Sequence, residues 1–334
     1  MLVADFEPLP WSDNVEGRPR RIGVEMEMAG VEPARIAEAV TATVGGRFEA
    51  ESAFSGVVRE TALGDFGIEL DASVLTSRRY LDSLKRLGIE IESDEVIDNV
   101  EEVLSRVAGV VVPHELVCPP VEERELPRID AIRARLREAG ARGTHSSALY
   151  AFGLQFNVDI ADAGADHLLA VLRAFFVSFD AICERERIDL SRKLTPFVQS
   201  FPEDYVAHVL DPGYRPDREQ LIDDYLAYTP TRNRPLDLLP LFAWMDRDRV
   251  MAAPVERHLV KPRPAWHYRL PNCLIDEPSW NLARPWREWV ALERLAADSG
   301  RLARRARARV DESSGLRRWL AAVLRAVVDR MRGR

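Results

Sequence analysis

Two segments of the sequence alternate strictly between apolar and oxygen-bearing side chains, and this alternation limits the possible folds more than any other feature. The oxygen-bearing positions are Glu25 and Glu27 in the first segment and Gln155, Asn157 and Asp159 in the second. Successive side chains of a β-strand point to opposite faces of the sheet. Residues 21–28 and 148–160 therefore each predict a strand with one polar and one apolar face.

The rest of the chain mixes further strands and helices without a regular βαβ period. Predicted helices begin after Pro33 and Pro127 and end at Gly45-Gly46 and at Gly140, because proline and glycine commonly mark helix boundaries. Further strands are predicted at residues 66–71 and 110–117, and helices at residues 34–44, 94–108, 128–139 and 166–187. This order favours an α+β fold with a mixed or mainly antiparallel sheet.

Residues 190–264 differ from the segments around them in composition. They hold many of the 21 prolines, together with short helical patterns at residues 218–227 and 236–245. We expect a loop-rich insertion over the sheet. The predicted organisation is an N-terminal extension (1–20), a main domain (21–298) that contains the insertion (190–264), and a helical tail (299–334).

The tail combines an apolar stripe with a high positive charge. Residues 301–334 contain eleven arginines and three acids, a net charge of +8, whereas the rest of the chain carries −16. The stripe recurs at helical spacing and consists of Leu316, Trp319, Leu320, Val323, Leu324, Val327, Val328 and Met331. We expect this amphipathic helix to dock on the acidic body of its own chain. The alternatives are a partner protein, a second subunit in a homo-oligomer, or an anionic membrane surface.

The composition argues against several classes of protein. An acidic body argues against nucleic acid as the main partner, because phosphate binding needs a basic surface. No apolar run approaches the roughly 18 residues needed to cross a bilayer, and the N-terminus carries acids where a signal peptide needs positive charge. The three cysteines form no CxxC motif, so neither a disulfide framework nor a zinc ribbon is expected. We therefore expect a cytoplasmic protein.

Carboxylates recur on the predicted strands. Glu25 and Glu27 leave the same face of one strand, where two adjacent negative charges repel each other. A hard cation such as Mg²⁺ or Mn²⁺ would hold this pair together and could carry nucleotide phosphates on its open positions. The alternative is a polar strand edge that faces solvent. Glu69 and Glu115 stand in similar strand contexts, with the same alternative.

Other catalytic motifs do not occur in the sequence. The segment His114-Glu115-Leu-Val-Cys118 approaches the HExxH zinc signature, but its fifth position is Cys and its neighbours disfavour the helix which that signature needs. The chain has no Gly-x-Ser-x-Gly motif and no P-loop. Among the histidines, His267 is the candidate for a site because it lies beside Arg269.

The acids and amides belong to an ordered series of short motifs. These are Gly23-Val-Glu25-Met-Glu27, Gly67-Ile-Glu69-Leu-Asp71, Glu115-Leu-Val-Cys-Pro-Pro120, Phe152-Gly-Leu-Gln155-Phe-Asn157 and Tyr268-Arg269-Leu-Pro-Asn272, followed by Asp276-Glu277 and Trp280. In this order they resemble the amidoligases of the carboxylate-amine ligase superfamily, which includes glutamine synthetase and glutamate-cysteine ligase. The resemblance spans about residues 21–297, and its specificity lies in the ordered set.

The resemblance implies a fold and a reaction. The fold is a glutamine-synthetase-like curved, mainly antiparallel sheet with helices packed outside. Its glutamates would hold two or three divalent ions against the phosphates of ATP. The substrate carboxylate would attack the γ-phosphate, and an amine would open the resulting acyl phosphate to leave an amide and inorganic phosphate. Metal ions and arginines would neutralise the transferred group.

The resemblance also assigns roles to residues, motif by motif. The implied metal ligands are Glu25, Glu27, Glu69, Glu115, Gln155 and Glu277, with Asp276 as the alternative to Glu277. The implied nucleotide-binding residues are Arg269, Asn272, Gln155 and Asn157, and the implied catalytic residues are Arg269 and Glu115. Glu25 and Glu27 would each serve a different metal, Glu115 would complete one of these sites, and Arg269 would face phosphate.

Two positions depart from the superfamily pattern. Gln155 stands where the superfamily often has His, and it offers a neutral carbonyl oxygen that weakens the second metal site. Asp276-Glu277-Pro278 replaces the usual Glu followed closely by Arg. The alternative function is a non-catalytic binding or scaffold protein that retains the fold. The expected substrates are a small-molecule or peptide carboxylate and an amine, whose identities the motifs do not specify.

Overall fold

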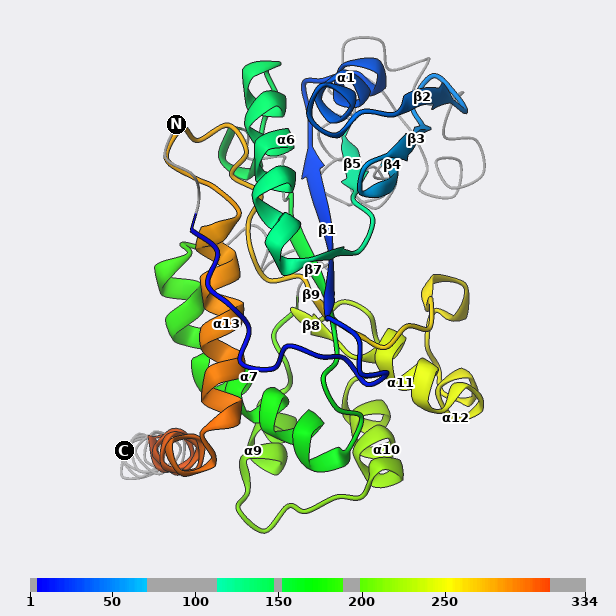
Figure 1. The fold of residues 1–334 in the computed structure, drawn as a ribbon. Coiled ribbons are helices and arrows are strands. Elements are labelled where there is room, and N and C mark those ends of the chain that lie inside the picture. The colour runs from blue at the N-terminus through cyan, green and yellow to red at the C-terminus, as the bar shows by residue number, and fades with distance from the viewer. Residues whose placement is uncertain (1–4, 71–112, 147–151, 189–198, 313–334) are drawn as a thin grey trace, which may run out of the picture.

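One antiparallel sheet forms the centre of the molecule. The computed structural model describes residues 5–70, 113–146, 152–188 and 199–312, and within them the sheet has nine strands in the order β2-β3-β4-β5-β1-β7-β9-β8, with β6 beside β1 (Figure 1). The strands are β1 (Arg21–Met28), β2 (Arg47–Ala50), β3 (Gly56–Thr61), β4 (Gly64–Leu70), β5 (His114–Val117), β6 (Val121–Glu122), β7 (Leu154–Asp159), β8 (Leu236–Asp237) and β9 (Ala265–Tyr268). The α+β class and the mainly antiparallel sheet are thereby confirmed.

Helices surround this sheet. They are α1 (Pro33–Val44), α6 (Leu126–Glu138), α7 (Ala165–Arg185), α9 (Glu203–Leu210), α10 (Arg218–Tyr228), α11 (Leu239–Met245), α12 (Arg247–Ala252) and α13 (Ala283–Ala297). Short 3₁₀ turns lie at Glu123–Glu125, Thr144–Ser146 and Arg257–Leu259, and residues 299–312 are also helical. None of the helices in the described ranges combines the length and the apolar character that crossing a bilayer requires.

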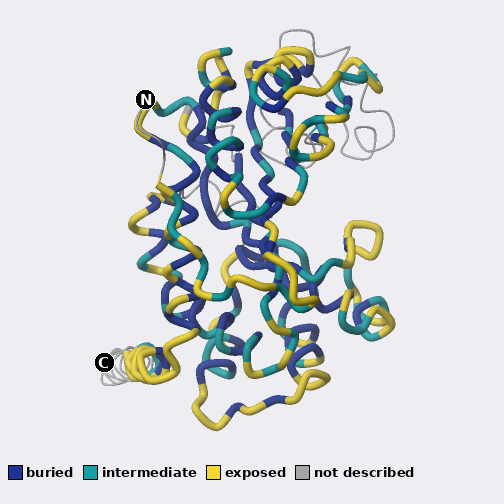
Figure 2. The backbone as a smooth tube through the Cα atoms, viewed as in Figure 1, coloured by how far each residue is buried: buried dark blue, intermediate teal, exposed yellow. Residues whose placement is uncertain are grey.

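The central strand β1 separates an apolar face from a polar one. Val24, Met26 and Met28 are fully buried, whereas Glu25 and Glu27 between them are half-buried. Aromatic contacts between strands and helices close the apolar face. They pair Phe156 with Trp286 at 5.6 Å, Tyr268 with Trp289 at 5.3 Å and Phe175 with Tyr268 at 6.3 Å between ring centroids. Helices α7 and α13 therefore cover the apolar face at β7 and β9, and buried residues concentrate there (Figure 2).

Proline and glycine set several helix boundaries as the sequence predicts. Helix α1 has Pro33 in its first turn and ends at Gly45, whose φ of 76° suits glycine. Helix α6 likewise has a proline in its first turn, and Gly140 follows its end with a φ of 96°. The predicted helix at 94–108 lies outside the described residues.

The described part of residues 190–264 contains regular elements between its loops. Their described part carries α9 to α12 as well as β8, which joins the sheet next to β9. Aromatic contacts join this region to the main core, with Phe201 and Tyr205 packed against Phe176 of α7. The helix predicted at 236–245 begins only at Leu239, because Pro240 fits the first turn of a helix and not its interior.

The N-terminal extension is fastened to α13. The Arg20 guanidinium donates to both carboxylate oxygens of Glu293 at 2.7 and 2.6 Å, and both side chains are 1% exposed. The Trp289 indole also donates to Glu293, while the Trp286 indole donates to the backbone oxygen of Glu7. The first part of the extension thus lies beside α13, as the blue and orange segments of Figure 1 show, and the chain then turns away before it enters β1.

The first part of the tail lies against α7. Leu302 and Ala306 are buried, Arg309 pairs with Asp180 at 3.0 Å, and Arg305 donates to the backbone oxygen of Val177. The apolar stripe at 316–331 lies outside the described residues, so its docking remains a prediction from sequence.

Candidate active site

Strand register brings glutamates from three strands side by side on the polar face. Glu69 of β4 is paired with Glu115 of β5, and Glu115 is paired with Glu27 of β1. On the other side of β1, Glu25 is paired with Gln155 of β7. Directly paired residues of antiparallel strands project from the same face, where like charges destabilise each other. This face therefore needs positive or hydrogen-donating partners.

Gln155 supplies one such partner. Its side-chain nitrogen Nε2 lies 2.9 Å from Glu27 Oε1 and 3.1 Å from Glu115 Oε1, and it donates to both. The backbone N–H of Gly153 donates to the second oxygen of Glu27 at 2.6 Å. Gln155 is buried, whereas Glu27 and Glu115 are half-buried. The amide nitrogen thus lies between two carboxylates, where a cation could also bind both.

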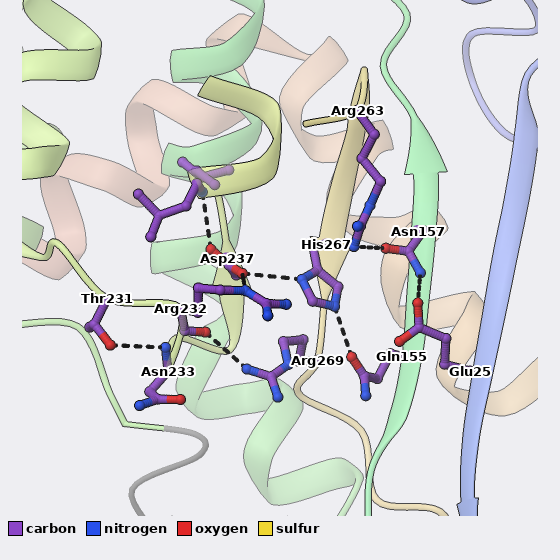
Figure 3. A network of polar contacts seen from close by, with 12 residues as sticks. Glu25, Gln155, Asn157, Thr231, Arg232, Asn233, Asp237, Arg263, His267 and Arg269 are labelled. Carbon is purple, nitrogen blue, oxygen red and sulfur yellow. Dashed lines mark hydrogen bonds and ion pairs between the residues drawn. The ribbon is translucent and has the colours of Figure 1, made fainter. Parts of the chain in front are cut away.

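Asn157 is the hydrogen-bond donor to Glu25 (Figure 3). Its Nδ2 donates to Glu25 Oε1 at 2.6 Å, while its Oδ1 accepts from Arg263 at 2.6 Å. Gly23 makes this arrangement possible, because a Cβ at that position would lie 3.3 Å from the Cβ of Asn157. A carboxylate, an amide and a guanidinium therefore form one continuous chain across β1, β7 and the entry to β9.

A buried His–Asp pair lies behind Gln155. His267 Nε2 is 2.8 Å from Gln155 Oε1, and His267 Nδ1 is 3.2 Å from Asp237 Oδ2. Asp237 accepts from the backbone N–H of Leu239 at 3.0 Å and from Arg232 Nε at 3.2 Å. Asp237 and His267 are 0% and 1% exposed. The pairing of β8 with β9 places these two residues opposite each other.

The neighbours keep the acids ionised despite burial. Burial alone would raise the pKa of the Glu25 carboxyl, but His267, Arg263 and Arg269 and the hydrogen bond from Asn157 hold it below its ordinary value. Burial likewise opposes ionisation of Asp237, yet the contact with His267 and the charges of Arg232 and Arg269 lower its pKa. Burial lowers the pKa of His267 to about 4, whereas the contact with Asp237 opposes this shift.

Arginines approach the same face from the β8 and β9 side. Arg263 precedes β9 and Arg269 follows it, and both act electrostatically on Glu25. Arg269 donates to the backbone oxygen of Arg232 at 2.9 Å, and its own N–H donates to Pro235. Figure 3 shows Arg232 and Arg269 on one side of His267, and the Arg263 guanidinium on the other side beside Asn157, whose amide contacts Glu25. Carboxylates and guanidinium groups are therefore interspersed across this face.

The predicted site residues lie in three places: the polar face of the sheet, the position of Asn272, and the segment of Asp276 and Glu277. On the polar face, the hydrogen bonds above join Glu25, Glu27, Glu115, Gln155 and Asn157. Glu69 adjoins Glu115 through strand register, and Arg269 reaches the face from β9. Asn272 is buried beside Gly153, and its side chain donates to the backbone oxygen of Arg187.

Glu277 lies in a different contact. One of its oxygens is 2.9 Å from His145 Nδ1, and both side chains are more than one-third exposed. The neighbouring Asp276 has one buried carboxylate oxygen without a hydrogen bond. The role of Asp276 or Glu277 as the late acidic ligand stays a prediction.

Sequence reasoning missed three residues of this face. Asp237, Arg232 and Arg263 all lie in the segment expected to be a loop-rich insertion. Asp237 carried a usable signal, because it sits within the apolar run Leu236-Asp237-Leu238-Leu239 and buried acids are rare unless paired. The two arginines carried no comparable signal, since arginine is common throughout this chain.

The ligand types present suit a hard divalent cation. No three side chains of the His, Cys, Asp and Glu types converge on a metal-sized position anywhere in the described ranges. The carboxylates of Glu27 and Glu115 nevertheless offer oxygen ligands, which Mg²⁺ and Mn²⁺ prefer. Gln155 turns its NH₂ toward these carboxylates and its oxygen toward His267, so the amide takes the place between them that a cation would take. The two carboxylates therefore fit such an ion, and the amide does not present an oxygen to it in this structure.

Comparison with known protein families identifies one family that this chain matches. A family model described as putative amidoligase enzyme matches residues 18–291, which is more than half of the sequence. The match includes every strand of the sheet and nearly all of the predicted site residues. No curated protein and no solved structure matches the chain significantly.

Proposed function

Because the chain belongs to this amidoligase family, we propose that it joins a carboxylate to an amine, with ATP as the energy source and Mg²⁺ or Mn²⁺ as the required ion. One observation carries the proposal beyond the family. Glu25 lies on the same face of the sheet as Glu27 and Glu115, and Arg263 and Arg269 beside β9 act on Glu25 electrostatically. A metal-bound triphosphate needs this combination of charges.

The acids and the arginines of this face would have separate roles. Glu27, Glu115 and Gln155 would hold one divalent ion, and Glu25 would serve a second. The ions would supply positive charge to the phosphates of ATP and so favour departure of ADP. Arg269 and Arg263 would orient the transferred phosphoryl group, because fixed cations stabilise charge that develops in the transition state.

The proposed reaction has two steps. A carboxylate oxygen of the acid forms a bond to the γ-phosphorus while the bond to the ADP oxygen breaks, which leaves an acyl phosphate. The amine nitrogen then bonds to the acyl carbon, inorganic phosphate departs with the original carboxylate oxygen, and the nitrogen loses a proton. The chain's residues position the reactants and exclude water, which protects the acyl phosphate from hydrolysis.

The described part of the insertion is the best candidate for selecting the acid and the amine. It brings Asp237 and Arg232 onto the sheet face, and α11 and α12 lie beside that face (Figure 1). A small-molecule or peptide carboxylate remains the substrate class that we propose.

The experiment is a screen of carboxylate and amine pairs for release of ADP from ATP with Mg²⁺ present. We expect at least one pair to release ADP and to yield an amide, and Glu27→Gln to abolish that release. For the active pair, ¹⁸O in the acid should appear in inorganic phosphate. AMP as the product, or label retained wholly in the acid, would refute the mechanism. Nucleotide binding without turnover for any pair would favour the non-catalytic alternative.

A further inference from the structure

A hollow of about 460 Å³ lies between α7, the turn after α9, the end of α13 and the helix at residues 299–312. Figure 1 shows that helix in orange to red at the lower end of α13. The hollow is on the α7 side of the sheet, whereas the glutamates of the candidate active site lie on the polar face. Its volume falls within the roughly 300–1,000 Å³ of small-molecule sites, so it has room for a ligand.

Buried apolar side chains form the floor of this hollow. The buried residues that line it are Leu169, Leu210, Ala296, Leu302 and Ala306. Covering such a floor with a hydrocarbon group removes apolar surface from water, which is favourable. The floor therefore suits the apolar part of a ligand.

Helical spacing places charged residues beside the floor. On α7, Asp166 lies one turn before Leu169 and Arg173 lies one turn after it, so all three share one side of the helix. On the helix at 299–312, Arg307 lies one turn after Ala303, and both line the hollow. Each of the two helices thus brings an arginine to the rim.

A third arginine reaches the rim from a turn that Arg173 holds in place. The Arg173 Nε donates to the backbone oxygen of Val209 at 2.7 Å, and its Nη2 donates to those of Asp211 and Tyr214 at 2.8 and 2.9 Å. The Asp211 carboxylate accepts from the backbone of the same turn at 2.6 Å. Arg215 directly follows this turn, so its backbone position is fixed relative to α7.

The rim carries an excess of positive charge. Arg173, Arg215 and Arg307 line the hollow together with a single acid, Asp166, which gives a net charge of +2 in a chain that carries −8 as a whole. Burial and the charge of Arg215 lower the pKa of Arg173 more than Asp211 and Asp166 raise it. Arg215 and Arg307 are exposed, and within the described ranges neither forms an ion pair. Their charges are therefore available to an anion.

We propose that this hollow binds a small amphipathic carboxylate, whose charged group pairs with Arg215 and Arg307 while its hydrocarbon part covers the apolar floor. A guanidinium group matches a carboxylate with two parallel hydrogen bonds. Asp166 on the same rim disfavours a ligand with several negative charges, such as a nucleotide. The site is separate from the polar face, so the inference does not depend on the proposed ligase activity.

Charge argues against the chain's own tail as the occupant. Residues 313–334 contain six arginines and one acid, Asp329, so their net charge is +5. A rim of arginines repels such a segment, whereas it attracts a carboxylate. An apolar stripe alone would fit the floor, but the charges that accompany it would not fit the rim.

The experiment compares octanoate with octanol, its uncharged analogue, in calorimetric titrations of the full chain. We expect octanoate to bind at one site per chain, and the double variant Arg215→Gln, Arg307→Gln to weaken it by about tenfold or more, because charge-assisted hydrogen bonds are lost. Octanol should bind both proteins equally. The control Arg301→Gln, Arg304→Gln removes the same charge from exposed positions outside the hollow and should bind octanoate as the unmodified protein does. Ala303→Trp, which fills the hollow, should weaken both ligands.

Several results would overturn the inference. Octanoate that does not bind, or that binds the Arg215→Gln, Arg307→Gln variant as tightly as the unmodified protein, would show that the rim does not recognise a carboxylate. Equal losses of octanoate and octanol in that variant would show that the arginines do not act through charge. Self-association in sedimentation experiments that this variant abolishes, and that octanoate does not reverse, would assign the hollow to a second copy of the chain instead.

Discussion

At the residue scale, Glu25 shows how the polar face tolerates clustered acids. Burial opposes the charge on Glu25, while Arg263, Arg269 and the Asn157 amide favour it, and the outcome is a lowered pKa. The same balance recurs at Asp237 with Arg232. Acids and arginines of this face thus depend on one another, so a change to one partner alters the charge state of the others.

This dependence gives a prediction for stability against pH. A carboxyl whose folded-state pKa lies below its unfolded value of 4.5 stabilises the fold above that value, and the contribution is lost as the pH falls through the folded-state pKa. Arg263→Gln should therefore lower the free energy of unfolding more at pH 7 than at pH 4, as measured in urea. The exposed Arg35→Gln on α1 serves as the control, with a small, pH-independent effect. A larger loss for Arg263→Gln at pH 4 would contradict the assignment.

At the scale of elements, a buried ion pair joins Arg20, which directly precedes β1, to Glu293 of α13. Arg20 and Glu293 have no access to solvent that could replace a lost partner. Glu293→Gln should cost about 3–5 kcal/mol, because it leaves the Arg20 guanidinium buried without its counter-charge. Glu7→Gln, which removes exposed contacts with Arg287 and Arg294, should cost less than about 1 kcal/mol. Equal losses in thermal unfolding would show that burial is not the cause.

Elements with strong local patterns were predictable from sequence. Strand β1 matches its predicted bounds because apolar residues occupy every second position from Ile22 to Met28. Helix α7 was predicted within about two residues because its apolar periodicity is long. Strands β2, β3, β6, β8 and β9 were not predicted. All of these except β3 span only two to four residues, and their pairing partners decide their conformation.

The difference between local patterns and long-range pairing also explains which site residues could be predicted from the sequence. Glu25, Glu27, Gln155 and Asn157 lie on the two best-patterned strands, so their common face could be derived from period-two alternation alone. The contribution of Asp237 depends on the pairing of β8 with β9, which joins residues about thirty positions apart in the chain. Local patterns carry no information about such pairing.

At the scale of the whole molecule, the charge asymmetry between body and tail leads to a prediction about the last residues. The sequence stripe at 316–331 offers large apolar side chains, each worth about 1.5–3 kcal/mol when buried. Removing residues 313–334 should lower the melting temperature or cause aggregation, yet leave Mg-ATP binding per folded molecule unchanged. A control that replaces only tail arginines with Gln keeps the stripe and should melt closer to the full chain. An equally stable truncation would mean that the stripe serves a partner or a membrane.

The central claim is that one face of the sheet holds the metal ions and the triphosphate together. Its most direct test is a crystal structure of the protein with Mn²⁺ and a non-hydrolysable ATP analogue, with manganese located by anomalous diffraction. We predict a manganese peak in contact with Glu27, Glu115 and Gln155, bridged to the triphosphate, with Arg269 on its phosphates. Manganese absent from these residues, or a triphosphate bound elsewhere, would contradict the account.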